Sequence, residues 1–534
     1  MSRRILLACT AAMALSFGAA RADTLVVCSE ASPDALNSAL STANTSFDVS
    51  EQIADRLVEM EIGGSRLKPA LAESWAVSDD GLRYTFNLRR GVKFQSNAVF
   101  KPTRDFNADD VVFSFTRMFD KEHRYYKVSG GTYLAFSAFI GSALKSVSKT
   151  DDYTVVFELN APLAPLLSSL SVQPFAVSSA EYAAAMDKAG TPEKLDLEPL
   201  GTGPFQLVQY QKDSLIRFRA FPDFWGAKGG QPERAAKVDQ LVFSITPDAA
   251  VRFAKLRAGE CQVARYPNPA DMPAMRTTAG VVVQESTIAS MGYLSFRTDK
   301  KPFSDKRVRE ALASAIDLDN LVKAVFQGTG SPAASVVSPT LWGHNPALKP
   351  RPYDPARAKA LLAEAGFPTG FNIDLWAIPV ARAYMPNGRR AAEMIQADWA
   401  KIGVTAKIVT YEWGEYLRRA RNNESEAGML GGTWDYPDPA QMLGGFTCGA
   451  LANGRNIPQW CNKEYSDLVQ KANIVTSVDE RTKLYQQAQQ IIHDEVPMML
   501  FADAKAFVGV SAKVNGFKLH FLGGQPFGGV SLKP

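Results

Sequence analysis

FNIDLWAIPVARAYMPNGRRAAEMIQADWAKIGVTAKIVTYEW, residues 371–413, decides the fold class of this chain. Residues 371–378 and 405–413 are rich in β-branched and aromatic residues, which is typical of strands. Between them, residues 387–403 carry apolar side chains at helical spacing, which predicts a helix. The order strand, helix, strand is typical of two parallel strands in one sheet. The stretch therefore predicts an α/β domain.

Strands and helices also intermingle on the N-terminal side of this stretch. Residues 353–366 predict an amphipathic helix with Asp354 as its cap, Pro355 in its first turn and Gly366 after its end. The other predicted elements are a strand at 24–30, a helix at 44–59, a hairpin at 76–94, a helix at 106–119 capped by Asn107, a strand at 201–213 and a helix at 307–326.

The first 22 residues have the pattern of a cleavable secretory signal. Arginines precede an apolar run, and small residues precede the predicted cleavage after Ala22. Cys9 imitates a lipoprotein cleavage box, but only about four apolar residues precede it, which is too few for the usual apolar region. No later apolar stretch approaches the roughly 18 residues of a membrane span. We therefore expect a soluble, exported chain that begins at Asp23.

The charge of the mature chain is nearly balanced. Removal of the signal, which includes Arg3, Arg4 and Arg21, leaves 56 basic residues against 55 acidic ones. Nucleic-acid-binding proteins carry an excess of basic residues, and segments that attach a protein to an anionic membrane surface carry runs of basic residues. We therefore expect neither nucleic acid nor a membrane surface as a partner. About 512 mature residues predict two or three domains.

Four cysteines remain in the mature chain. In an oxidising compartment an even number indicates disulfides, here two. Cys448 and Cys461 are 13 residues apart, which suggests a local bridge. The remaining pair would then join Cys28 to Cys261 and imply a domain built from discontinuous segments. Three pairings are formally possible.

Signatures of catalysis and of metal binding are weak. No H-E-x-x-H, G-x-S-x-G or phosphate-loop motif occurs. Two S-x-x-K strings, Ser142 to Lys145 and Ser146 to Lys149, lack the partner strings of serine acyl-enzymes. We therefore expect no enzyme, no cofactor and no metal site. The histidines are scattered singly and are interpreted as structural: His123, His344, His493 and His520.

Phrases spread along the whole chain resemble one family. They include CSEASPDALN, PALAESWAVSDDG, FNADDVVFSF, GTPEKLDLEPLGTGPFQL and most of the opening stretch, in matching order and spacing. Together they are similar to the periplasmic dipeptide-binding proteins of bacterial ABC transporters, within solute-binding protein family 5. The resemblance runs from about residue 24 to the C-terminus.

The resemblance implies a two-lobed, hinged periplasmic solute-binding fold of type II, with an extra α/β subdomain inserted in the N-terminal lobe. The chain would cross between the lobes twice. Cys28 and Cys261 would then both lie in lobe I, and Cys448 and Cys461 in lobe II. The implied boundaries are a signal peptide at 1–22, lobe I at 23–56, 196–287 and 506–534, the inserted subdomain at 57–195 and lobe II at 288–505.

The family also implies a site for the two charged ends of a dipeptide. Asp435, in the stretch GGTWDYPDPAQ at 431–441, matches the aspartate that receives the ligand ammonium. The alternative for Asp435 is a solvated loop residue. Asp438 directly precedes Pro439, the order typical of a helix cap followed by a first-turn proline, so we assign Asp438 a structural role.

Arg382 matches the arginine that receives the ligand carboxylate. A guanidinium suits this task because its planar donors can engage both carboxylate oxygens. The alternative is a solvent-facing arginine. We expect Asp435 and Arg382 on facing walls of the cleft, where their fixed spacing would select ligands of two residues.

Main-chain contacts to the ligand are implied at further positions. An extended peptide gains affinity from such contacts without its side chains being read. Residues 431–435, GGTWD, depart from the sequence G-W-T-G-D that relatives commonly have at this position. Asn44 stands where relatives commonly have a small residue. Trp434 therefore either contacts a ligand side chain or packs within its lobe. The implied positions are Thr42, Ala43, Asn44, Ala383, Tyr384, Gly432, Thr433 and Trp434.

The implied function is the binding component of a dipeptide ABC importer. The lobes would close over a dipeptide, and the closed form would be recognised by a membrane permease; we expect a monomer. The same scaffold could instead bind haem, glutathione or longer peptides. A secreted peptidase is the alternative from another class, and it would need a nucleophile or metal motif that is missing from the sequence.

Overall fold

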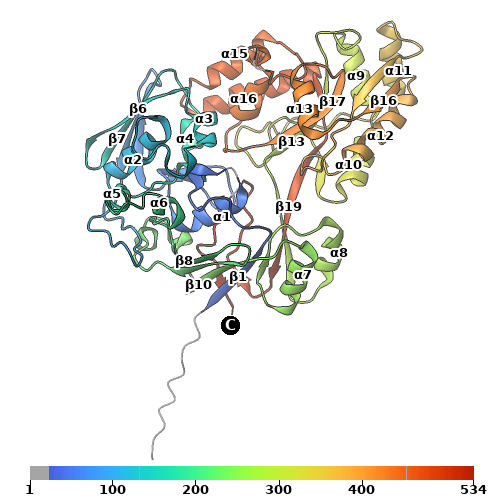
Figure 1. Ribbon diagram of the computed structural model, residues 1–534. Helices are drawn as coiled ribbons and strands as arrows, with labels where there is room; N and C mark the ends of the chain where they lie inside the picture. The colour runs from blue at the N-terminus through green and yellow to red at the C-terminus, as the bar shows by residue number, and fades with distance from the viewer. Residues whose placement is uncertain (1–22, 42, 132, 453, 523, 534) are drawn as a thin grey trace, which may run out of the picture.

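The computed structural model describes residues 23–41, 43–131, 133–452, 454–522 and 524–533. The predicted signal peptide and the predicted ligand contact Thr42 lie outside the described residues. Two α/β lobes make up the chain, as expected, and Figure 1 shows them joined by the strand β19 (Ala502–Ser511). Within the described ranges, no helix is both long and apolar enough to cross a membrane.

The sheet of lobe I contains the first strand of the chain at its centre. The strand β1 pairs in parallel with β10 on one side and with β11 on the other. Cys28 in β1 forms a disulfide with Cys261, at a Cα–Cα distance of 5.9 Å, and so joins two distant parts of this lobe, as predicted. The main strand order is β12 (Val281–Thr287), β19, β11 (Val263–Ala264), β1 (Thr24–Ser29), β10 (Gln240–Ile245), β9 (Leu215–Ala220) and β8 (Phe205–Gln211).

The sheet of lobe II contains the stretch that decided the fold class. The strands β15 and β16 are parallel neighbours, and the helix α12 (Gly388–Ala400) connects them, so this prediction is confirmed. The Asn387 side chain caps α12 by accepting a hydrogen bond from the Arg390 amide. The strand order is β16 (Thr405–Val409), β15 (Asn372–Trp376), β17 (Ala427–Thr433), β13 (Ser290–Phe296) and β18 (Met498–Leu500).

A third sheet is built from residues between β1 and β8. Its strand order is β4 (Ala72–Val77), β5 (Arg83–Leu88), β7 (Thr154–Leu159) and β6 (Leu144–Asp151), all antiparallel. β4 and β5 confirm the hairpin predicted across the Asp-Gly turn. Beside this sheet lies α2 (Ala108–Phe119), whose N-terminus carries the predicted Asn107 cap.

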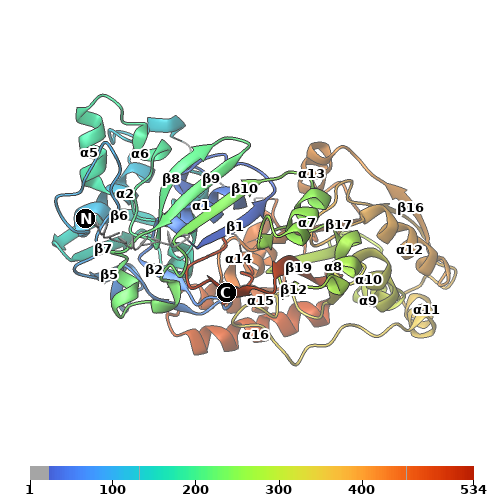
Figure 2. The same cartoon turned by 90° about the horizontal axis from the view of Figure 1, so that it is seen from below.

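Two crossings connect the lobes. One is Ile288–Ala289, between β12 and β13, and the other lies within β19, between Ala504, which pairs with β14, and Lys505, which pairs with β12. The backbones of the crossings are tied together, because the Ile288 amide donates to the Ala504 carbonyl at 2.9 Å. The strand β14 (Gly330–Pro332) of lobe II pairs with the first residues of β19, so β19 belongs to both lobes. In Figure 2, seen from below, the end of the lobe I sheet that carries β12 overlaps lobe II.

Two predicted helices differ from the structure. The helix predicted at 44–59 ends early, as α1 (Asn44–Ile53), and the strand β2 (Val58–Met60) follows it. The helix ends there because Asp55 and the residues after it enter a buried ion-pair cluster. The helix predicted at 307–326 is two helices, because Asp317 leaves the helical conformation and caps the second by accepting from the Asn320 amide. The two are α9 (Lys306–Ser314) and α10 (Leu318–Phe326).

The remaining elements complete both lobes. Asp354 caps α11, as predicted, by accepting from the Arg357 amide. In lobe II a second disulfide joins Cys448 to Cys461, with a Cα–Cα distance of 4.6 Å, and confirms the predicted local bridge. The other helices and strands are β3 (Leu67–Pro69), α3 (Leu134–Phe139), α4 (Leu166–Leu170), α5 (Ala180–Lys188), α6 (Lys194–Leu197), α7 (Ala249–Ala258), α8 (Met272–Thr277), α11 (Pro355–Glu364), α13 (Trp413–Arg421), α14 (Ala440–Leu443), α15 (Lys463–Ala472), α16 (Val478–Glu495), β20 (Val514–Asn515) and β21 (Ser531–Leu532).

Candidate ligand-binding site

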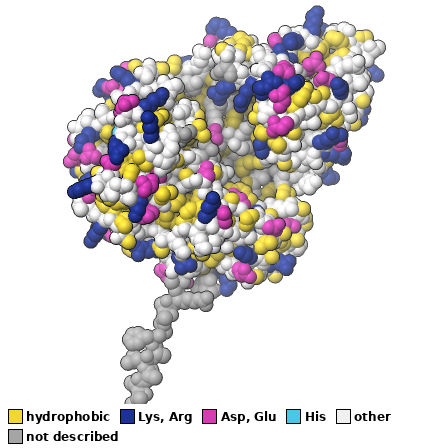
Figure 3. All heavy atoms as spheres, in the orientation of Figure 1, with side chains coloured by type: hydrophobic (Ala, Val, Ile, Leu, Met, Phe, Trp, Pro, Cys, Tyr) yellow, Lys and Arg dark blue, Asp and Glu magenta, His cyan; other side chains and the backbone are white. Residues whose placement is uncertain are grey.

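A cleft of about 1110 Å³ lies between the lobes. Figure 3 shows it as a groove that separates the two halves of the molecular surface. A cleft of this size is slightly larger than most small-molecule sites, which occupy roughly 300 to 1,000 Å³. Its walls come from both lobes and both crossings, through residues in the segments 44–47, 134–139, 172–174, 265–270, 288–289, 325–329, 381–387, 433–435, 505–507 and 519–522.

The predicted acid Asp435 lines the cleft, two residues after the end of β17. Its carboxylate is exposed to the cleft. Gln441 of α14 holds the residue at two points: Nε2 donates to Asp435 Oδ2 at 2.6 Å, and Oε1 accepts from the Asp435 amide at 2.8 Å. The protein around the carboxyl raises the pKa of Asp435, and the hydrogen bond from Gln441 opposes that rise. An acid fixed in this way presents one orientation to a cationic group.

The predicted base Arg382 lies in the loop that follows β15. Its side chain is exposed and lines the cleft. The guanidinium lies over the Trp413 ring, 5.0 Å from the ring centroid, which restricts its position. The backbones of Arg382 and Met385 exchange two hydrogen bonds of 3.0 Å and close a tight turn, with Ala383 at the cleft surface.

Asp435 and Arg382 belong to the same lobe. The strands β15 and β17 are parallel neighbours in the sheet of lobe II, and both residues follow the carboxyl ends of these strands. Ligands of open α/β sheets bind at that edge. The structure brings the two residues into one cleft, but the expectation that they lie on facing walls is wrong. The implied boundaries already assign both residues to lobe II, but the sequence did not show that β15 pairs with β17, which puts both residues at one edge of the sheet.

The other predicted contacts of lobe II divide into two groups. Thr433 and Trp434 line the cleft, whereas Gly432 and Tyr384 are absent from its described lining. Tyr384 is only 7% exposed and packs against the backbone of β17. Trp434 is 3% exposed and donates from Nε1 to the Asp438 carbonyl at 3.1 Å, so packing within the lobe is the better interpretation of this residue.

Lobe I contributes the N-terminal end of α1. Ala43 is the N-cap residue, and Asn44, the first helical residue, lines the cleft with an exposed side chain. The first amides of a helix have no partner within the helix, and they carry partial positive charge. This end of α1 therefore favours an acceptor group of a ligand.

Arg265 and Tyr266 line the cleft, and sequence reasoning missed both. Arg265 is buried, with Nη1 3.2 Å from Asp48 Oδ1 and Nη2 donating to the Tyr266 hydroxyl at 2.8 Å. Tyr266 has a left-handed backbone, with φ of 48°, and its carbonyl accepts from Arg252 at 2.7 Å. Such strain persists where surrounding contacts enforce it, often at functional sites. In the sequence, residues 266–271 (YPNPAD) contain no motif that by itself predicts a place in a ligand-binding cleft.

Asp438 has the structural role that its position before Pro439 predicts. Its carboxylate accepts from the Ala440 amide at 3.0 Å, at the start of α14. The same fully buried carboxylate also pairs with Arg481 at 2.9 Å and accepts from the Ser168 hydroxyl at 3.3 Å. Ser168 lies in α4, outside lobe II. Asp438 thus ties the loop that carries Asp435 to the N-terminal half of the chain.

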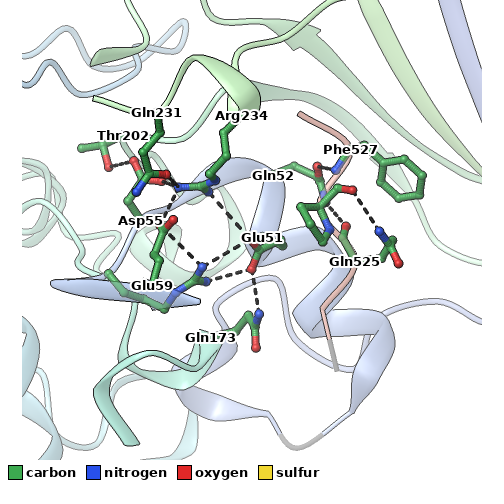
Figure 4. Close-up of polar contacts among 12 residues, drawn as sticks. Glu51, Gln52, Asp55, Glu59, Gln173, Thr202, Gln231, Arg234, Gln525 and Phe527 are labelled. Atoms are coloured by element: carbon green, nitrogen blue, oxygen red, sulfur yellow. Dashed lines mark hydrogen bonds and ion pairs between the residues drawn. The ribbon is translucent and has the colours of Figure 1, made fainter. Parts of the chain in front are cut away.

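A buried polar network lies directly beneath the lobe I wall. Figure 4 shows its acids, Glu51, Asp55 and Glu59, around Arg234. Arg234 pairs with Asp55 at 2.8 Å, and Arg56 pairs with Glu51 at 2.9 Å. Three acids face two arginines here, and burial raises the pKa of Glu59.

This network extends to the cleft. The Gln173 amide, at the cleft wall, donates to Glu51 at 2.7 Å. One turn earlier on α1, Asp48 accepts from Arg265 and, at 2.7 Å, from the Gln525 amide. The buried face of α1 thus holds three segments of the wall in place. Across the described ranges, no three His, Cys, Asp or Glu residues gather in a way that could hold a metal ion.

Comparisons with known proteins agree on one family. Residues 66–453 match the model of the bacterial extracellular solute-binding proteins, family 5. The chain is 49% identical over 516 residues to the dipeptide-binding protein of Escherichia coli K12, covering 96% of this chain and 95% of that one. It is 44% identical over 512 residues to haem-binding protein A of Haemophilus influenzae, covering 96% and 92%.

A solved structure is also similar over nearly the whole chain. HbpA2 from Haemophilus parasuis superposes with a TM-score of 0.92 at 42% sequence identity, covering 96% of this chain and 100% of that one. Its agreement extends over both lobes. Fold, cleft and comparisons lead to one conclusion: the chain belongs to family 5 of the bacterial extracellular solute-binding proteins.

Proposed function

We propose that this protein is the extracytoplasmic binding component of a dipeptide ABC importer. The observation that carries the proposal is the pair Asp435 and Arg382, which stand at the ends of neighbouring parallel strands in one cleft. A free dipeptide carries an ammonium and a carboxylate at its two ends. One acid and one base with fixed positions suit such a ligand. The similarity to the E. coli dipeptide-binding protein supports this assignment.

Binding would begin on lobe II. Because Asp435 and Arg382 both belong to this lobe, a dipeptide can place both charged ends on it before the lobes close. Lobe I would then close over the peptide through the end of α1 and the Arg265 to Tyr266 wall. Closure excludes water, which strengthens both charge contacts.

Length selection follows from the two anchors. Each terminal charge needs an opposite charge when water leaves the site. Extra residues would move one terminus of a longer peptide away from its partner. A family 5 protein with these anchors would deliver its ligand to permease subunits in the membrane, from the periplasm and as a monomer.

Calorimetry with dipeptides tests this proposal. The protein would first be unfolded and refolded to remove copurified peptide. Asp435→Ala should weaken the binding of Ala-Ala by about 2 to 5 kcal/mol, the scale for truncating one partner of a buried charge pair. Asp467→Ala is the matched control, because Asp467 is an exposed acid of lobe II outside the cleft lining. Unchanged affinity in Asp435→Ala would remove this residue from the site.

Haem is a second candidate ligand. The observation that favours it is the 44% identity to haem-binding protein A of H. influenzae. Competition separates the two: haem that shares the dipeptide site should be displaced by Ala-Ala, and haem bound elsewhere should not. Recovery of intact peptide after long incubation would dismiss a peptidase.

A further inference from the structure

The short helix α3 presents an apolar face to the cleft. Its sequence is LAFSAF, and Leu134, Ala135, Ala138 and Phe139 all line the cleft. Leu134 and Ala138 are four residues apart, so they lie on the same side of the helix, and both are exposed. Leu134 is 59% exposed, although it is a large apolar side chain. Clustered exposed apolar groups in a soluble protein mark a surface that binds something.

Further apolar residues line the cleft, and two of them, Val172 and Pro174, flank Gln173 in a segment that contacts α3. Three separate segments supply them, so this part of the wall is built by the tertiary structure. Two amide side chains lie in these segments: Gln173 donates its hydrogen bond to Glu51, and Asn44 is exposed at the start of α1. The charged residues of the cleft lining come from other segments. The further apolar residues of the lining are Phe47, Val172, Pro174, Phe521 and Leu522.

This apolar wall lies beside the acid of the site. The Phe139 ring contacts the Tyr436 ring edge-on, with 5.1 Å between centroids. Tyr436 directly follows Asp435, and its amide is held by the same Gln441 side chain. The contact places α3 next to the loop that would receive the ligand ammonium. In Figure 1, α3 lies at the edge of the N-terminal half that faces lobe II.

We propose that the exposed face of α3 forms the subsite for the side chain of the ligand's first residue. A peptide whose ammonium pairs with Asp435 has its first side chain two bonds from that ammonium, next to α3. The subsite would therefore favour dipeptides that begin with a large apolar residue such as leucine. This inference rests on the proposed function.

The test compares three dipeptides, Leu-Ala, Ala-Leu and Ala-Ala, on the full chain stripped of peptide. Leu134→Ser removes apolar surface without adding charge near the ammonium. It should weaken Leu-Ala by about fivefold, the loss expected for roughly 1 kcal/mol of apolar burial, and change Ala-Leu and Ala-Ala by less than about twofold. Leu197→Ser is the matched control, because Leu197 is also 59% exposed and lies outside the cleft lining.

A second variant covers the case in which Leu134→Ser does not fold. Ala138→Leu fills the proposed subsite and should weaken Leu-Ala at least about fivefold more than Ala-Ala, since overpacking costs roughly 1 to 3 kcal/mol. Equal losses for all three peptides would mean that the substitutions weaken binding regardless of the first side chain, and would overturn the inference. So would unchanged affinities in both variants.

Failure of the proposed function gives a different result. In that case the unmodified protein binds none of the three dipeptides, or Asp435→Ala binds them as tightly as the unmodified chain. A selective loss of Leu-Ala in the α3 variants, with Ala-Ala binding still dependent on Asp435, supports both the subsite and the proposed function.

Discussion

At the scale of single residues, Gln441 controls the acid of the site. It holds the Asp435 amide and carboxylate at once, so the ring of contacts fixes the side chain before a ligand arrives. The same hydrogen bond lowers the pKa of Asp435 against the rise caused by burial. Asp435 must be ionised to attract an ammonium. Dipeptide affinity should therefore fall when the pH drops through the pKa of Asp435.

Replacing Gln441 should move this pH dependence. In Gln441→Leu the opposing hydrogen bond is gone, so the pKa of Asp435 rises further and affinity is lost at a higher pH than in the unmodified protein. Calorimetric affinities for Ala-Ala between pH 4 and pH 8 measure the shift. Gln470→Leu, on an exposed face of α15, is the control and should keep the original profile. If all three proteins lose affinity at the same pH, Gln441 has no positioning role for Asp435.

The Asp438–Arg481 pair should matter for stability. Both side chains are buried, and Arg481→Met would leave the Asp438 carboxylate without its cationic partner. Breaking a buried pair in this way costs about 3 to 5 kcal/mol. Urea unfolding measures the loss. The exposed pair of Lys463 and Asp467 provides the comparison, and Lys463→Met should cost less than about 1 kcal/mol. Similar small losses at both sites would contradict the structural role given to Asp438.

At the scale of elements, β19 carries a titratable group between the lobes. Burial raises the pKa of Asp503 to about 7, from 3.8. Asp503 lies opposite Ser331 of β14, where β19 belongs to lobe II. A carboxyl whose pKa is higher in the folded state binds a proton more tightly there. Its contribution to stability is therefore largest at low pH and is lost as the pH rises from about 4 to about 7.

The variant Asp503→Asn should remove this dependence. Relative to the unmodified protein, it should gain unfolding free energy as the pH rises from 4 to 7, because the cost of the buried charge is gone. Urea titrations at several pH values in this range give the comparison. Asp319→Asn, an exposed acid of α10, should track the unmodified protein at every pH. A constant difference between Asp503→Asn and the unmodified chain would show that Asp503 does not titrate in this window.

The elements that the sequence predicted well are those with local determinants. The segment 371–413 carries its own strand patterns, and Asn387 caps its helix. The prediction of one helix over residues 44–59 was wrong because the second half of this segment forms ion pairs with Arg234, which is distant in the sequence. α3 as a cleft wall could not be predicted for the same reason. Nothing in LAFSAF shows that it adjoins Tyr436.

For the binding site, too, the sequence predicted some residues and missed others. Asp435 and Arg382 were found through the family resemblance, and the structure places both in the cleft. Their position at one edge of the same sheet depends on the pairing of β15 with β17, which is a property of the tertiary structure. Arg265 was missed because its role depends on Asp48, 217 residues away.

At the scale of the whole molecule, the lobes meet at more than the two crossings. The apolar core of residues 57–177 is continuous with that around α15 and α16 of lobe II. The Ala164 amide donates to the Asn473 carbonyl at 2.8 Å, close to the bond between Ser168 and Asp438. Any closing motion of the lobes therefore has to accommodate these contacts as well as the two crossings. Because residues 57–195 contain a sheet of their own, we propose that they form the inserted subdomain of lobe I and are distinct from lobe II.

One calorimetric experiment tests the central claim, that Asp435 and Arg382 each hold one end of the ligand. Ala-Leu, its N-acetylated form and its C-terminal amide would be titrated into the unmodified protein, Asp435→Ala and Arg382→Ala. We predict that Asp435→Ala loses its preference for the free ammonium but keeps its preference for the free carboxylate, and that Arg382→Ala does the reverse. If both variants still discriminate against both modified peptides, the account is contradicted.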